Sequence, residues 1–265
     1  MISFLKKLVR MLGFEVLRTQ TWEAHARRTA LADLVQGNRV DVLSLVIESI
    51  KDSRHPFFFV QVGANDGATD DPVGRIARER GWSGILIEPQ PDAFKRLKQN
   101  YTDTQGFSFE NVAIATDQSG ITLYRFVCLK TGERPQDLFA SADRNRLVQA
   151  RKRFGWDFDI EEVHVPAMSL DDVLSKHNVS IVDLLLVDTE GMDFEVIRTL
   201  DFGRVAPRII QFEHIHLSST DLANCLGLLR SQGYEFALQD RDVIAMLAKG
   251  LPASSAHRAN VLATA

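Results

Sequence analysis

The chain has 265 residues, of which 45% are hydrophobic and 25% are charged, and its formal net charge is −4. That size suits one large domain, and the acidic balance argues against nucleic acid as a partner, because nucleic-acid-binding domains are usually basic. Its two cysteines, Cys128 and Cys225, form no CxxC pair, so we expect neither a disulfide framework nor a zinc cluster, and the cytoplasm is the default location.

Residues 1–50 are predicted to form an N-terminal helical extension to a domain at 51–265. Within 1–18, apolar and basic side chains fall on opposite faces of one helix. Such a helix suits weak association with an anionic membrane surface, which would place the protein at the inner face of the membrane. The alternatives are packing on the domain itself or on the second subunit of a homodimer.

From residue 57 onwards, short apolar runs alternate with helical patterns. Strands are predicted at 57–62, 84–88, 107–115, 120–127, 182–191, 208–214, 234–239 and 242–248, and helices at 72–80, 91–101, 169–178, 193–200 and 219–233. Helix caps are expected at Asp71 and Ser169, and a helix stop at Gly233. This alternation is typical of an α/β protein with a mainly parallel sheet and covering helices.

Segment 128–165 interrupts this alternation and is predicted to be an insertion or a lid-like segment. It contains a basic run at 144–153, close to Trp156, that would suit an anionic acceptor. The commoner meaning of such a run is a solvated helix face, so its role stays open.

The loop after the first strand, residues 63–67, lies where an open parallel sheet binds ligands. A dinucleotide-binding loop has three glycines, but Asn65 stands at the place of the second, and carboxylates in and after this loop would repel a pyrophosphate. The carboxylates suit a ligand with a cationic amino group instead. Glu88 ends the second strand, where an acid can accept hydrogen bonds from ribose hydroxyls. A ribose, an amino group and no phosphate together predict S-adenosylmethionine.

Six segments resemble the FkbM family of S-adenosylmethionine-dependent methyltransferases. In chain order they are VQVGANDG, GILIEPQPDAFKRLKQNY, FENVAIA, SLDDVL, DLLLVDTEGMDFEVI and IIQFEH. The resemblance implies a Rossmann-like, mostly parallel seven-stranded sheet with helices on both faces and an antiparallel last strand. It also implies O-methylation of a hydroxyl on a sugar, a glycan or a natural-product acceptor. Segments 1–50 and 128–165 lie outside it and would define the acceptor.

The expected cofactor-binding residues are Gly63, Ala64, Asn65, Asp66, Gly67, Glu88, Pro89, Asn111, Val112 and Asp188. The glycines would shape the loop around the methionine part, and Asn65 and Asp66 would contact its polar end. Asn111 and Val112 resemble family positions that face the adenine, although Asn111 has an equally good interpretation as a strand-end residue.

A hydroxyl acceptor must lose a proton, which calls for a general base or a metal. The candidate catalytic residues are Asp188, Glu213, His214 and His216. Asp188 ends the most apolar strand. Burying an acid there costs free energy unless the acid is paired or has a function. The two histidines would share one face if their strand continued, with Glu213 on the other, and either could instead bond the backbone.

No metal site is predicted, although Asp188, Glu190 and Glu213 could instead gather a cation such as magnesium. Asp193 is expected to be only a cap of the following helix. Two other functions stay open. One is a nicotinamide-dependent oxidoreductase, which the missing middle glycine disfavours, and the other is a non-catalytic scaffold that keeps the methyltransferase fold.

Overall fold

The computed structural model describes Leu43, Val46, Ile47 and residues 56–69, 71, 73–127 and 140–248. The amphipathic segment 1–18 lies outside the described residues, as does most of the predicted helical extension. Leu43, Val46 and Ile47 are helical and buried, and they pack against one face of the sheet. No helix in the described part of the chain is long and apolar enough to cross a membrane.

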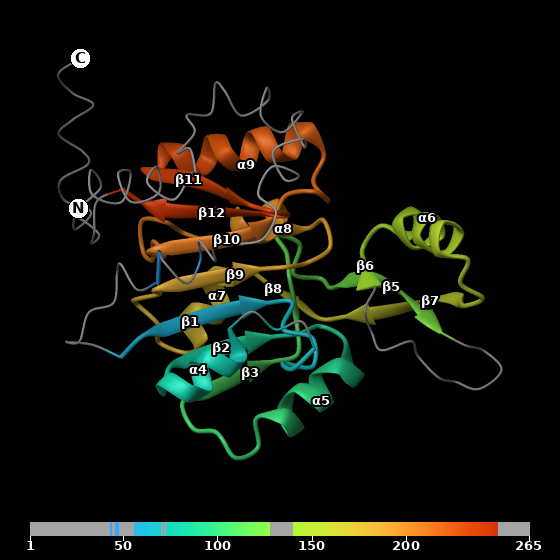
Figure 1. Cartoon of the computed structure of the whole chain (residues 1–265), viewed down its shortest axis with the longest axis horizontal. Coiled ribbons are helices and arrows are strands. Elements are labelled where there is room, and N and C mark those ends of the chain that lie inside the picture. Colours follow the sequence, from blue (N-terminus) through green and yellow to red (C-terminus); the bar gives the residue numbers. More distant parts are fainter. Residues whose placement is uncertain are drawn as a thin grey trace, which may run out of the picture.

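A seven-stranded sheet forms the centre of the molecule, in the order β11-β12-β10-β9-β1-β2-β3 (Figure 1). Its strands are β1 Phe58–Val62, β2 Ser83–Ile87, β3 Phe107–Glu110, β9 Leu184–Val187, β10 Ile209–Glu213, β11 Tyr234–Gln239 and β12 Asp242–Leu247. The pairs from β10 through β9, β1 and β2 to β3 are parallel, whereas β12 is antiparallel to both β10 and β11. The predicted Rossmann-like sheet with an antiparallel last strand is confirmed.

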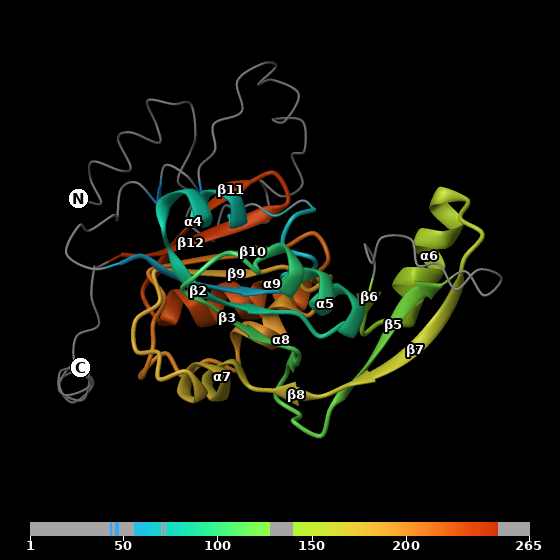
Figure 2. The same ribbon diagram turned by 90° about the horizontal axis from the view of Figure 1, so that it is seen from below.

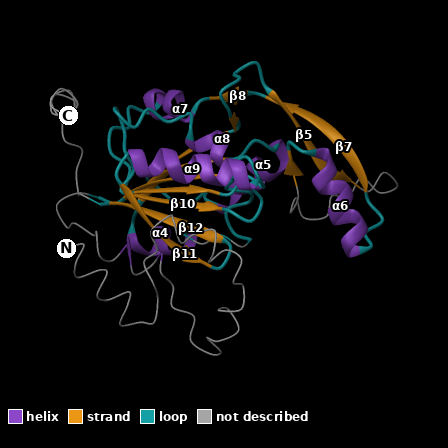
Figure 3. Ribbon diagram, turned by 90° about the horizontal axis from the view of Figure 1, so that it is seen from above, coloured by secondary structure: helices purple, strands orange, loops and turns teal. Residues whose placement is uncertain are grey.

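Helices cover both faces of this sheet (Figure 3). They are α4 Gly74–Arg80, α5 Pro91–Asn100, α7 Leu170–Lys176, α8 Asp193–Ile197 and α9 Ser219–Ser231. Successive residues of β1 point to opposite faces, so Val60 joins the apolar cluster beneath α7, α8 and α9, while Phe59 joins the cluster beneath α4 and α5. Both faces are buried, which explains the continuous apolar runs of the central strands.

Several predicted boundaries are corrected. The strand predicted at 182–191 spans only Leu184–Val187, and Asp188 lies just beyond it. The strand predicted at 107–115 ends at Glu110, because the Asn111 side-chain amide donates to the carbonyls of Glu88 and Pro89 and the chain leaves the sheet there. The next residues form β4 Ala113–Ile114, which pairs with β8 Ala167–Met168.

The helix predicted from 72 begins at Gly74. Asp71 Oδ1 accepts from the N–H groups of Val73 and Gly74, so it closes the turn before the helix and is not its cap residue. The Ser169 cap is confirmed, since its hydroxyl accepts from the Asp172 N–H.

A second, antiparallel sheet projects from the main body (Figure 2). It has the order β6-β5-β7 and is made of β5 Ile121–Val127, β6 Ala140–Ser141 and β7 Asp159–Val165, with α6 Arg144–Phe154 packed on it. We call these elements the projecting module. The basic run 144–153 therefore lies on α6. Arg125 of β5 is buried and bridges Glu161 of the module and Asp92 of α5, which ties the module to the main body.

Candidate active site

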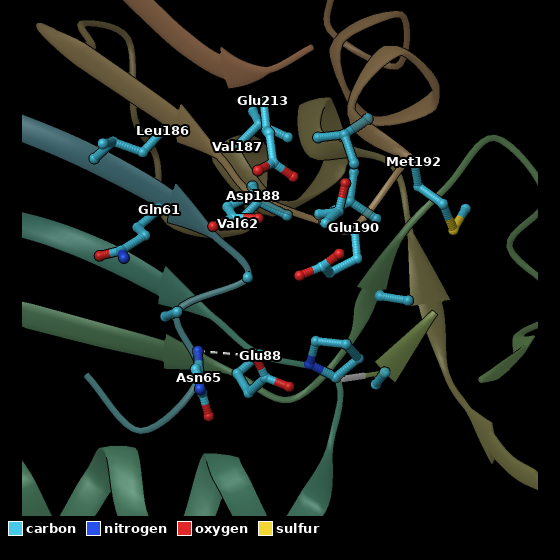
Figure 4. A pocket seen from close by; sticks show the side chains of 18 of the residues that line it. Gln61, Val62, Asn65, Glu88, Leu186, Val187, Asp188, Glu190, Met192 and Glu213 are labelled. Carbon is cyan, nitrogen blue, oxygen red and sulfur yellow. Dashed lines mark hydrogen bonds between the residues drawn. The ribbon is translucent and has the colours of Figure 1, made fainter. Parts of the chain in front are cut away.

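A pocket of about 440 Å³ opens at the carboxyl ends of the parallel strands (Figure 4). Residues at or just after the ends of β1, β2, β9 and β10 form one wall. Ile121 and Leu123 of β5 and Ala140 of β6 form another. The pocket thus lies where an open α/β sheet binds its ligand, between the sheet and the projecting module.

The glycine loop passes very close to the end of β9. Gly63 has φ +85°, and a Cβ atom built on it would lie 1.8 Å from the Asp188 carbonyl oxygen. The N–H groups of Gly63 and Ala64 both donate to the Ile87 carbonyl, which joins the loop to the end of β2. Gly63, Ala64 and Asn65 of the predicted cofactor loop line the pocket, and their contact with a cofactor stays a prediction.

The rest of the loop turns away from the pocket. Asp66 Oδ1 accepts from the N–H groups of Ala68 and Thr69, so its carboxylate is used within its own turn. Gly67 packs against Leu97 of α5. Neither Asp66 nor Gly67 lines the pocket, and their direct contact with a cofactor stays a prediction.

Glu88 is a buried carboxylate that joins two loops. Its Oε2 accepts from the Asn65 N–H at 2.9 Å and its Oε1 from the Gln90 N–H at 2.8 Å. Burial raises its pKa to about 7, against the opposing effect of these hydrogen bonds. Each carboxylate oxygen keeps a second lone pair, so Glu88 can still accept from a ligand in the pocket.

The pocket lining is rich in hydrogen-bond acceptors that have no donor. The buried oxygens without a hydrogen bond in the described residues include one atom each of Gln61, Asn65, Gln90, Gln211 and Glu213, all of which line the pocket. Gln211 Nε2 donates to Asp242 Oδ2 at 2.6 Å, which identifies the other amide atom as the unpaired oxygen. Such a lining suits a ligand that carries donors and positive charge.

Asp188 follows the last residue of β9 and lines this pocket. Its backbone N–H donates to the Val62 carbonyl, which continues the pairing of β9 with β1. Desolvation raises the pKa of its carboxyl group, while the charges of Arg241 and Arg146 oppose that rise. Asp188 therefore lies beside the glycine loop, and its predicted position near the sulfonium and the acceptor hydroxyl stays a prediction.

A polar cluster lies at the end of β10. Glu213 Oε1 is 2.8 Å from Arg241 Nη2, and Glu213 Oε2 is 3.2 Å from His216 Nε2. The same His216 nitrogen is 3.3 Å from Glu190 Oε2. Burial and the Asp188 charge raise the pKa of Glu213 to about 8, whereas burial and two arginines lower the pKa of His216 to about 4.

Most of the other predicted residues do not line the pocket. The backbone N–H of His214 donates to the Arg241 carbonyl, and its ring interacts with the backbone of Asp240, in line with the alternative of a backbone-bonding histidine. Asn111 and Val112 do not line the pocket, whereas Pro89 does. The adenine-facing role of Asn111 and Val112 stays a prediction.

The prediction that Asp193 is only a helix cap is wrong. Met192 is the N-cap of α8, and Asp193 is a fully buried first helical residue. Its carboxylate accepts from the Thr189 hydroxyl and from the N–H groups of Gly191 and Glu213, so it fastens the loop after β9 to β10. Burial, aided by the Asp188 charge, raises its pKa to about 7.

Several pocket residues were missed in the sequence. Gln61 and Gln211 each interrupt an apolar run, which is a signal that could have found them. Arg241 and Asp242 carry no such signal, because Arg241 lies in the turn before β12, Asp242 begins that strand, and their proximity to β10 depends on the pairing of β12.

The family model described as Methyltransferase FkbM domain matches residues 61–236, a range that contains the glycine loop, Glu88, Asp188 and Glu213. The chain belongs to the FkbM methyltransferase family. Its main sheet has the strand arrangement that the resemblance to this family implied.

Solved structures that match this chain are distant from it in sequence. An FkbM methyltransferase from Methylobacillus flagellatus KT is 16% identical, with a TM-score of 0.46, over 74% of this chain and 44% of that one. The N-terminal domain of human METTL16 in complex with SAH is 14% identical, with a TM-score of 0.41, over 78% of this chain and 67% of that one. The present chain thus spans less than half of that FkbM protein. No curated protein matches its sequence.

Proposed function

We propose that this FkbM methyltransferase binds S-adenosylmethionine and transfers its methyl group to a hydroxyl oxygen of a sugar, a glycan or a natural-product acceptor. The observation that carries the proposal is the excess of unpaired acceptors in the pocket, to which Glu88, Asp188 and Asp242 add carboxylates. S-adenosylmethionine brings the matching groups: an ammonium, two ribose hydroxyls, an adenine amino group and a positive sulfonium.

Glu88 is the proposed ribose ligand. It follows β2 directly and is held by the Asn65 and Gln90 N–H groups, so its position is fixed before a ligand arrives. Asn65 and Gln61, at and near the end of β1, would then meet the methionine part with their free amide oxygens.

Asp188 is the proposed proton acceptor. The acceptor oxygen forms a bond to the methyl carbon, the carbon–sulfur bond breaks with its electron pair moving to sulfur, and the hydroxyl proton passes to the Asp188 carboxylate. A raised carboxyl pKa makes Asp188 a better base at neutral pH.

Two features support oxygen as the methylated atom and a small acceptor. The loop after β9 reads Asp188-Thr189-Glu190-Gly191 and lacks the Asn-Pro-Pro-Tyr or Asp-Pro-Pro-Tyr sequence that would favour an exocyclic nitrogen. The module contributes Ile121, Leu123 and Ala140 to the pocket wall, and these apolar side chains suit the carbon face of a sugar or a natural product.

The test is calorimetric titration of the protein with S-adenosylhomocysteine. Wild type should bind it with micromolar affinity, and Glu88→Ala should weaken binding several-fold to a hundredfold, since a hydrogen bond to a charged group contributes about 1.5–3 kcal/mol. Glu79→Ala, on the exposed side of α4, serves as the control and should bind like wild type. A folded wild type that does not bind would refute the proposal and favour a scaffold, and binding of NAD instead would favour an oxidoreductase.

The role of Asp188 is tested separately, with an acceptor found in a panel of hydroxylated sugars and natural products. Asp188→Asn should lower the rate of methyl transfer at least a hundredfold, because the amide cannot take the proton. Its affinity for S-adenosylhomocysteine should change only a few-fold. A variant that keeps the wild-type rate would show that another group removes the proton.

A further inference from the structure

Three side chains that can bind a metal converge beside the pocket. Glu190, Glu213 and His216 each offer one ligand atom, and in the described part of the chain these atoms all lie within 4.8 Å of one another. We propose that they bind one divalent transition-metal ion. This set differs from the Asp188, Glu190 and Glu213 alternative considered from the sequence, because His216 replaces Asp188.

The contact with Arg241 bears on which nitrogen of His216 can bind a metal. Arg241 Nη2 is 3.2 Å from His216 Nε2, and a guanidinium can only donate, so the tautomer that accepts this hydrogen bond has its lone pair on Nε2. Glu213 Oε2 and Glu190 Oε2 lie 3.2 and 3.3 Å from this nitrogen. Arg146 Nη2 also lies 3.2 Å from Glu190 Oε2, so two arginines now border these three atoms, and a metal ion would take over the stabilisation that their positive charges provide.

The spacing of these atoms fits a metal. Ligand atoms about 2.1 Å from a metal ion lie about 3.0 Å apart in an octahedron and about 3.4 Å apart in a tetrahedron. The separations of His216 Nε2 from Glu213 Oε2 and Glu190 Oε2, 3.2 and 3.3 Å, fall between these values. The two carboxylate oxygens lie within 4.8 Å of each other, so side-chain adjustments would bring all three atoms around one ion.

Glu213 provides an independent observation. Its side chain is only 8% exposed, it lines the pocket, and its Oε2 accepts no hydrogen bond from the described residues. A buried carboxylate oxygen without a donor is costly, so this atom needs a partner. Arg241 contacts the other oxygen, and because its side chain is 60% exposed it can move aside into solvent.

The ligand chemistry selects the class of metal. Two carboxylates alone would suit Mg²⁺ or Ca²⁺, but an imidazole nitrogen favours first-row transition metals. We therefore take Mn²⁺ as the probe. Glu190 and Glu213 line the pocket together with Asp188, so a bound cation would lie near the acceptor. If the proposed methyl transfer holds, the ion would lower the pKa of the acceptor hydroxyl.

The experiment is titration of the full chain with Mn²⁺ after removal of metals by a chelator. Wild type should bind one Mn²⁺ per chain, and Mg²⁺ should bind at least tenfold more weakly. His216→Ala and Glu213→Gln should each weaken Mn²⁺ binding at least tenfold. Glu79→Gln removes an exposed carboxylate of α4 that does not line the pocket, and it should change the affinity less than threefold. Arg241→Ala should tighten binding several-fold, because it removes a competing cation.

Lack of Mn²⁺ binding to the wild type below millimolar concentration would overturn the proposal. Unchanged binding in both His216→Ala and Glu213→Gln would also overturn it, since the ion would then be held elsewhere. S-adenosylhomocysteine titration of the same samples reports on folding and on the cofactor site. A failure of the metal site is therefore distinguishable from a failure of the proposed function.

Discussion

At Gly63, the loop after β1 leaves no room for a side chain. A Cβ atom there would meet the Asp188 carbonyl oxygen at 1.8 Å, and the backbone has φ +85°. We expect Gly63→Ala to destabilise the fold by more than about 2 kcal/mol, because steric overlap adds to backbone strain, and to abolish binding of S-adenosylhomocysteine. Urea denaturation and calorimetry measure the two effects.

Gly81 provides the matched control for this substitution. It has φ +64°, and a Cβ atom there would meet nothing within 4 Å. Gly81→Ala should therefore cost only the strain of a left-handed backbone, about 1–2 kcal/mol, and leave ligand binding unchanged. Equal losses of stability in the two variants would show that contact with the end of β9 is not what requires glycine at residue 63.

The sequence predicts strand-end residues better than it predicts clusters. Glu88 and Asp188 could be placed together because both end apolar runs, and parallel strands bring those ends to one edge of the sheet. The approach of His216 to Glu213 could not be predicted. Strict alternation puts them on opposite faces, but β10 ends at Glu213 and a turn, closed by the Leu217 N–H to the His214 carbonyl, folds His216 back.

At the scale of elements, the projecting module is held to the main sheet beside the pocket. Arg146 of α6 donates to the Glu190 carbonyl oxygen and pairs with its carboxylate, and the Ser141 hydroxyl donates to the same carbonyl. Arg146→Ala should therefore loosen this contact. We expect faster hydrogen exchange in β6, α6 and the loop after β9, with little change in the central strands.

Arg144, exposed on the same helix, provides the comparison. Arg144→Ala removes the same kind of side chain, and its exchange pattern should match wild type. If both variants exchanged equally fast, the effect would come from α6 itself, and the bridge to Glu190 would not be what holds the module.

The module also marks where element prediction failed. The central strands were predicted because they are buried on both faces and therefore form continuous apolar runs. Helix α6 was not predicted from the sequence. Leu147 is the only buried residue of this helix, so the apolar periodicity of the helix is weak. The end of β3 was missed for another reason, since the Asn111 contacts that end it come from a neighbouring loop and leave no local signal.

At the scale of the whole molecule, buried acids make stability depend on pH. Burial raises the pKa values of Glu88 and Asp193 to about 7 and of Glu213 to about 8, from values of 4.5 or below. A raised carboxyl pKa stabilises the fold fully below the unfolded pKa, and this contribution is lost as pH rises through the folded pKa. The free energy of unfolding should therefore fall from pH 6.5 to about pH 8, as measured by urea denaturation.

The histidines do not reverse this trend in that range. The pKa values of His214 and His216 are lowered from 6.5, so their effect on stability is confined to lower pH. Of these three carboxyl groups, Glu213 has the highest pKa. Glu213→Gln removes it and should therefore reduce the fall of the unfolding free energy with pH. If the free energy of unfolding instead rose between pH 6.5 and about pH 8, these carboxyl groups would not have the raised pKa values that burial gives them.

The place of β12 affects how the protein can be made. It pairs with β10 on one side and β11 on the other, with Asp242 opposite Glu213, although it follows both strands in the chain. While the ribosome is still synthesising β12, β10 presents an open edge and β11 has no neighbour to join. The nascent chain would carry an unpaired strand beside the incomplete pocket, where chaperones or other nascent chains can bind it. The wall that contains Glu213, Arg241 and Asp242 would close only after residue 247 has left the ribosomal exit tunnel.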